Sequence, residues 1–150
     1  MLLIRNQKVS ISQKAVKLEQ KLLRAQMNPH FIFNTLNSIQ YYVFQNDKIA
    51  SNTYMSKFAT LMRQTLENSR NTAIPVKDEL DALKLYLELE TLRFKENLEW
   101  SIDMDEEIDE YLYKIPTMLI QPYVENAINH GLMHKVGKGR VQISLRKAKG

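Results

Sequence analysis

A seven-residue apolar repeat dominates the first third of the sequence. Its members follow with gaps of four and three residues: Ile11, Ala15, Leu18, Leu22, Ala25, Pro29, Ile32, Leu36, Ile39 and Val43. This period is typical of a helix packed against near-parallel neighbours. The repeat predicts one helix over about residues 10–45, kinked at Pro29 and on the order of 50 Å long at ~1.5 Å per residue. A helix of that length needs a bundle or a dimer to bury its apolar stripe.

A second amphipathic segment follows the polar turn at residues 45–48. Its apolar side chains recur at helical spacing to about Ser69, and Ser51, Asn46 or Asp47 is suited to be its N-cap. A short connection between two long amphipathic helices predicts an antiparallel hairpin. Two such hairpins related by a two-fold axis would form a dimeric four-helix bundle.

After residue 70 the sequence pattern changes. We expect a helix over about residues 77–95, a strand at 98–103, a helix from Thr117 to about Gly131 opened by Ile115–Pro116, and a strand at 140–146. The predicted fold class is mainly α with a partial α+β C-terminal part. Residues 1–70 form the helical hairpin, and residues 71–150 begin an α/β layer through a helix-strand-helix-strand order.

The amino-acid composition argues against several classes of protein function. The chain has no cysteine, which excludes a disulfide framework and a cysteine-ligated zinc site. The net charge is +4, and no basic stripe with interleaved aromatics is present, so we expect no nucleic-acid partner. The apolar start at residues 1–5 is too short for a signal peptide or a membrane span. We therefore expect a cytoplasmic chain, with any membrane-bound sensor part lying upstream of it.

His30 and Asn34 form the first candidate site. His30 follows the stripe member Pro29, so it projects about 100° from the apolar seam, where a neutral imidazole nitrogen is an accessible nucleophile. Asn34 lies one turn further on and could hold the ring tautomer or orient an incoming phosphoryl group. The alternative is that His30 is an ordinary hydrogen-bonded residue at the edge of the seam and that Pro29 reflects packing alone.

Four polar residues of the later helix form the second candidate site: Glu125, Asn126, Asn129 and His130. Magnesium takes few protein ligands and retains phosphate and water oxygens, so one asparagine oxygen with a triphosphate suits it. The alternative is a set of polar residues facing outward from a core helix. A metal pair of His130 and His134 is disfavoured because Gly131 interrupts the helix and no third ligand is evident.

Two motifs together resemble the LytS-type sensor histidine kinases of two-component systems. They are QMNPHFIFNTLN at residues 26–37 and LIQPYVENAINHG at residues 119–131, and YLELETLRF at residues 86–94 also matches in kind. The resemblance covers about residues 15–146. It implies a homodimer whose hairpin accepts a phosphoryl group, followed by the start of a Bergerat-type (GHKL) ATP-binding domain.

The resemblance also implies roles for individual residues. His30 would be the phospho-acceptor, Asn126 would hold Mg²⁺ on the nucleotide phosphates, and Glu125, Asn129 and His130 would line the ATP pocket. The phosphoryl group would pass from ATP to His30 and then to an aspartate of a response regulator.

This sequence departs from the family pattern at three places. Phe31 follows the histidine where many histidine kinases have an acidic residue, so the base that activates His30 is not identified. Asn129 occupies a position that is often basic, and the sequence given stops before any glycine-rich nucleotide box. We therefore expect this chain alone to bind ATP poorly. A non-catalytic dimeric coiled-coil module, or a kinase remnant, is the alternative function.

Overall fold

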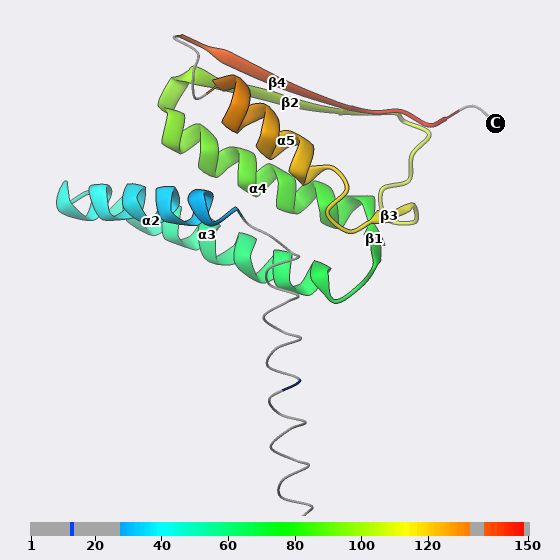
Figure 1. The fold of residues 1–150 in the computed structure, drawn as a ribbon, viewed down its shortest axis with the longest axis horizontal. Coiled ribbons are helices and arrows are strands. Elements are labelled where there is room, and N and C mark those ends of the chain that lie inside the picture. The colour runs from blue at the N-terminus through cyan, green and yellow to red at the C-terminus, as the bar shows by residue number, and fades with distance from the viewer. Residues whose placement is uncertain (1–12, 14–27, 133–136, 149–150) are drawn as a thin grey trace, which may run out of the picture.

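The computed structural model describes residues 13, 28–132 and 137–148 (Figure 1). Helices α2 and α3 lie side by side on one face of α4, and α5 lies with strands β2 and β4 on its other side (Figure 1). Helices dominate, and the strands form two sheets of two strands each. The predicted class, mainly α with a partial β component, is therefore confirmed. Among the described residues, no helix is both long enough and apolar enough to cross a bilayer.

Helix α2 spans Pro29–Phe44 and begins at the proline. Asn28 is its N-cap, with φ −48° and ψ 122°, and the Asn28 Oδ1 accepts a hydrogen bond of 3.0 Å from the His30 N–H. The prediction of a helix continuing through Pro29 is therefore wrong. The first helical position suits proline because its fixed φ is helical and no N–H is needed there. The part of the predicted helix before Asn28 lies, apart from residue 13, outside the described residues.

Helix α3 spans Lys48–Ser69 and runs back alongside α2 (Figure 1). Asp47 is its N-cap, because the Asp47 Oδ1 accepts a hydrogen bond of 3.0 Å from the Ala50 N–H. Asn46 turns the chain with a positive φ of 58°, a conformation that asparagine tolerates better than most residues. The predicted antiparallel hairpin and its end at Ser69 are confirmed.

The buried face of α2 differs from the predicted seam. Phe31, Thr35 and Ile39 are buried against the rest of the chain, whereas Leu36 and Val43 are 47% and 55% exposed. Ile39 belongs to both faces, but Phe31 and Thr35 each precede a member of the seven-residue repeat by one residue, so the packing face is rotated from the stripe by somewhat less than the ~100° that separates neighbouring residues. That stripe is thus largely uncovered within one chain.

Helix α4, Val76–Phe94, lies at the centre of the core. Leu83, Leu87 and Leu89 are fully buried, and the Tyr86 ring packs on Phe31 with centroids 4.9 Å apart. A helix buried on several sides needs apolar residues around most of its circumference, as α4 has. One contiguous core therefore joins the hairpin to the residues after position 70. The predicted helix over residues 77–95 is confirmed to within one residue at each end.

Strand β2, Leu98–Met104, pairs in parallel with β4, Gly139–Leu145, as in the pair Trp100↔Val141. Both strands were expected from their alternating patterns. A short 3₁₀ helix, Lys95–Asn97, links α4 to β2. Strands β1, Ala73–Pro75, and β3, Lys114–Pro116, pair antiparallel and were missed. Each is three residues long, and each is defined by a partner about 40 residues away, which local patterns do not reveal.

Helix α5 is shorter than predicted. It spans Gln121–Ala127 and continues as a π-helix over Ile128–Leu132, so the expected helix from Thr117 to Gly131 is wrong at its start. Met118 has a positive φ of 62°, which is incompatible with a helix. The buried Glu79 carboxylate accepts a hydrogen bond of 3.3 Å from the Ile120 N–H and anchors this entry to α4.

Candidate functional site

His30 is the second residue of α2, and its side chain is exposed. Its position follows from Pro29 and Asn28, which together fix where the helix starts. The first turn of a helix has unpaired N–H groups and a partial positive charge, so an anionic group on this side chain is favoured there by about 0.3–1 kcal/mol. The local structure therefore suits a histidine that accepts a negatively charged group.

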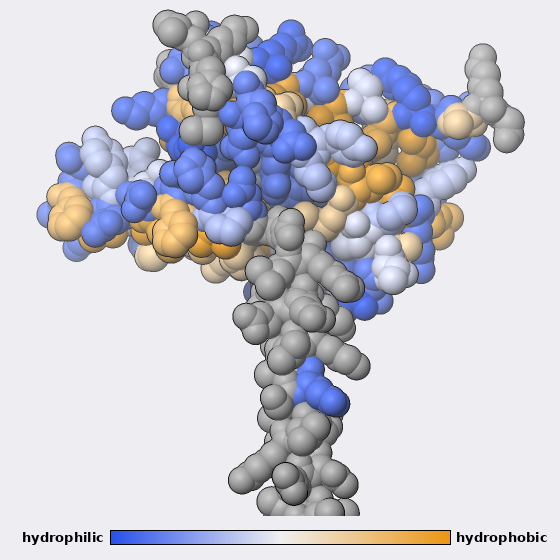
Figure 2. Space-filling view, viewed as in Figure 1, coloured by the Kyte–Doolittle hydropathy of each residue, from blue (hydrophilic) through white to orange (hydrophobic). Residues whose placement is uncertain are grey.

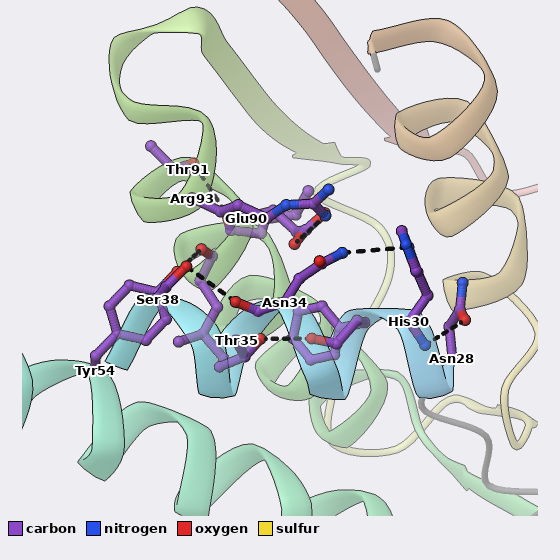
Figure 3. A network of polar contacts seen from close by, with 12 residues as sticks. Asn28, His30, Asn34, Thr35, Ser38, Tyr54, Glu90, Thr91 and Arg93 are labelled. Atoms are coloured by element: carbon purple, nitrogen blue, oxygen red, sulfur yellow. Dashed lines mark hydrogen bonds and ion pairs between the residues drawn. The ribbon is translucent and has the colours of Figure 1, made fainter. Parts of the chain in front are cut away.

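Asn34 lies one turn after His30 and contacts its ring. The Asn34 Nδ2 is 3.2 Å from the His30 Nδ1, as predicted from their spacing (Figure 3). An amide can donate to or accept from this nitrogen, depending on which of its ends faces the ring. Since Nδ1 is occupied by Asn34, the Nε2 nitrogen is the one open to an incoming group.

A buried ion pair of α4 lies beside Asn34 (Figure 3). The Arg93 Nη1 is 3.4 and 3.5 Å from the two carboxylate oxygens of Glu90, which is only 1% exposed. Burial raises the pKa of the Glu90 carboxyl, and the neighbouring Arg93 partly offsets that rise. We did not single out this pair from the sequence, because an i, i+3 Glu–Arg pair is usually a solvated surface contact.

A pocket of about 260 Å³ opens between α2 and the end of α4. Five of its lining residues come from α2 and three from the end of α4 and the following turn: Asn34, Asn37, Ser38, Tyr41, Tyr42, Leu92, Arg93 and Lys95. Asn34 thus belongs both to this pocket and to the His30 contact. The pocket depends on the packing of α2 against α4, so the sequence alone did not indicate it.

The four candidates of α5 and of the π-helix that follows it divide between two environments. Asn126 and His130 are exposed, and Asn129 is half-buried. Glu125 is also half-buried, and its Oε1 accepts a hydrogen bond of 3.2 Å from the Gln121 Nε2. Burial raises the pKa of Glu125 to about 7; the hydrogen bond from Gln121 opposes this rise, and the charge of Glu90 adds to it.

A magnesium ion at this site would have few protein ligands. Among the described residues, no group of three or more histidines and carboxylates is arranged to hold a metal ion. The exposed amide oxygen of Asn126 is a suitable single ligand for an ion whose other ligands are phosphate and water oxygens. Within the described part of the chain, no hydrogen bond or ion pair joins these four candidates to His30 or Asn34.

The fold and the site define a helical hairpin with an exposed histidine, packed on helix α4, which also contacts strand β2 of a two-stranded parallel sheet. The family model for histidine kinases matches residues 18–98. The chain belongs to this family.

Proteins named as sensors are similar to this chain over a longer stretch than the family model matches. The chain is 36% identical over 137 residues to sensor histidine kinase BtsS and 37% identical over 135 residues to sensor histidine kinase YpdA, both of Escherichia coli K12. It is 35% identical over 127 residues to sensor protein LytS of Oceanobacillus iheyensis. These matches cover 83–90% of this chain but only 21–24% of the relatives. The chain thus spans about a quarter of their length, and the predicted likeness to LytS-type sensor histidine kinases is confirmed.

Proposed function

We propose that this chain carries the phospho-acceptor region of a two-component sensor histidine kinase, with His30 as the residue that receives the phosphoryl group from ATP. The observation that supports this most directly is the exposed imidazole of His30, held at Nδ1 by Asn34 in the first turn of α2. Asn34 acts as a positioning residue. We further propose that the intact protein is a membrane-bound sensor of which this chain is a cytoplasmic portion.

The proposed reaction forms a bond between the His30 Nε2 and the γ-phosphorus of ATP, while the bond from that phosphorus to the bridging oxygen of ADP breaks. The lone pair of Nε2 must be free, so the ring proton must reside on Nδ1 with the Asn34 oxygen as its acceptor. In the structure the Asn34 Nδ2 lies 3.2 Å from Nδ1, so in the proposed reactive arrangement the amide is turned to place its oxygen there instead. The phosphoryl group would then pass to an aspartate of a response regulator.

We propose that the four polar candidates of α5 and of the π-helix after it bind the nucleotide and its metal ion. Asn126 would hold Mg²⁺, which supplies neutralisation of phosphate charge when bound, and Glu125, Asn129 and His130 would line the ATP pocket. The parallel strands β2 and β4, with α5 between them in sequence, support the proposal that they begin a Bergerat-type domain. ATP and Mg²⁺ are therefore the proposed substrate and cofactor.

A homodimer is proposed on the uncovered face of the hairpin. Large apolar side chains are exposed along α2 and at the start of α3: Phe33, Leu36, Val43, Phe44 and Ile49. Figure 2 shows hydrophobic surface along this edge of the molecule. Exposed apolar surface of this extent commonly marks an interface, and a second hairpin would complete a four-helix bundle.

Transfer in trans tests the proposal. The chain is incubated with labelled ATP and a complete kinase of this family whose own acceptor histidine is replaced. We expect acid-labile label on this chain, its loss in His30→Gln, and its retention in the matched control His134→Gln. Label that persists in His30→Gln would refute the assignment. A dimer that accepts no label would instead support a non-catalytic interaction module.

A further inference from the structure

The pocket between α2 and the end of α4 is chemically biased towards anions. Two of its lining residues, Arg93 and Lys95, are cations, and no carboxylate lines it. Asn34, Asn37 and two tyrosines also line it, and side chains of these types can donate hydrogen bonds. Lining residues with several possible donors, drawn from two helices and the turn that follows, suit the several oxygens of a phosphate group.

Arg93 is held in a position to bind an anion. Its contacts to Glu90 both use Nη1, and its side chain is 17% exposed. The Phe94 ring lies 4.7 Å from the guanidinium carbon and restricts it further. An arginine fixed in this way loses little conformational freedom when it binds a planar or tetrahedral anion.

Lys95 occupies a backbone conformation that glycine would adopt more easily. Its φ is 56° and its ψ −128° where α4 ends. A side chain with a Cβ is strained in this region, at a free-energy cost that glycine avoids. The lysine nevertheless places a second cation at the pocket, which is consistent with a binding role.

We propose that this pocket binds a phosphate-type anion and that the bound anion selects the reactive tautomer of His30 through Asn34. The amide NH₂ of Asn34 would turn to the anion, so its oxygen would turn to the His30 Nδ1 and accept a hydrogen bond from an N–H at that position. The ring proton moves through solvent from Nε2 to Nδ1, and Nε2 is left with a free lone pair. A role for the His30 tautomer change in phosphoryl transfer rests on the proposed function. Anion binding in the pocket and the tautomer change itself do not depend on that function.

Nitrogen NMR of ¹⁵N-histidine-labelled chain tests both parts of the proposal. Inorganic phosphate and ATP are titrated separately at constant ionic strength in phosphate-free buffer, with chloride as the control anion. We expect saturable binding and an exchange of protonation between the two His30 nitrogens. Tighter binding of ATP would assign the pocket to a nucleotide phosphate chain, and tighter binding of inorganic phosphate would assign it to the free anion; either result supports the site.

Variants of the pocket residues, with one control variant outside the pocket, test whether the anion binds there. Lys95→Gly, which suits the backbone, and the charge-neutral pair Arg93→Gln with Glu90→Gln should each weaken binding at least tenfold. Arg146→Gln, which removes an exposed cation of the chain's C-terminal end, should leave binding unchanged. Equal affinity in all variants, or no saturable response to either ligand, would overturn the proposal. The trans-phosphorylation assay does not depend on this result, so the two proposals can fail separately.

Discussion

Replacement of Glu125 by glutamine should stabilise the fold at alkaline pH. The pKa of Glu125 is raised from 4.5 to about 7, chiefly by burial. The folded state therefore binds this proton more tightly than the unfolded state, and stability falls as the pH rises from about 4.5 to about 7. Glutamine stays neutral at every pH, and its oxygen can still accept the hydrogen bond from Gln121.

The size of the effect follows from the two pKa values. The difference corresponds to about 3.4 kcal/mol at 1.36 kcal/mol per pKa unit. Glu125 is only half-buried, so solvent weakens the effect of its ionisation on stability. We therefore expect Glu125→Gln to raise the free energy of unfolding by about 2 kcal/mol at pH 8. The gain should fall below about 1 kcal/mol at pH 5, where the folded wild type is already protonated.

Urea denaturation between pH 5 and pH 8 measures this difference. The protein concentration must be held constant, because self-association would add to the apparent stability. Glu107→Gln, in the exposed loop after β2, removes the same charge without changing the buried site. Stability curves of Glu125→Gln and wild type that remain parallel across this pH range would refute the reasoning.

The same urea denaturation assay tests three further features: the N-cap of α2, the backbone conformation of Lys95 and the burial of Leu83. Asn28→Ala should cost about 1 kcal/mol by removing the cap of α2, and Asn28→Ser should restore most of it; an equal loss in both would contradict the capping role. Lys95→Gly should stabilise by about 1 kcal/mol because of its positive φ, whereas Lys84→Gly inside α4 should destabilise by about 1 kcal/mol. Leu83→Ala should cost about 2–5 kcal/mol because its side chain is fully buried, and a loss under 1 kcal/mol would place the core elsewhere.

Local patterns predicted most of the regular elements. Helices α3 and α4 and strands β2 and β4 were found from their periodicities, because each is long enough to show which of its faces is apolar. The His30–Asn34 contact was also predictable, since residues four apart on a helix are neighbours wherever the helix packs.

Elements defined by distant partners were not predictable in this way. Strands β1 and β3 exist only through each other, and the start of α5 depends on the Glu79 carboxylate from α4. The burial of Glu90 was not predicted from the sequence, because it depends on how other elements pack around α4. The raised pKa of Glu125 has the same origin.

The sequence by itself determined the family to which the chain belongs, and it identified His30 and Asn34 as candidates for the chemistry. The motif around His30 and the period of its helix are local properties, and they hold before any packing takes place. Tertiary structure alone decided which face of α2 is buried. The apolar repeat and the packing face share Ile39, and only the burial of Phe31 and Thr35, which lie outside the repeat, reveals the choice. The same packing of α2 on α4 forms the pocket beside Asn34, because its walls come from segments at least 50 residues apart, the distance from Tyr42 to Leu92.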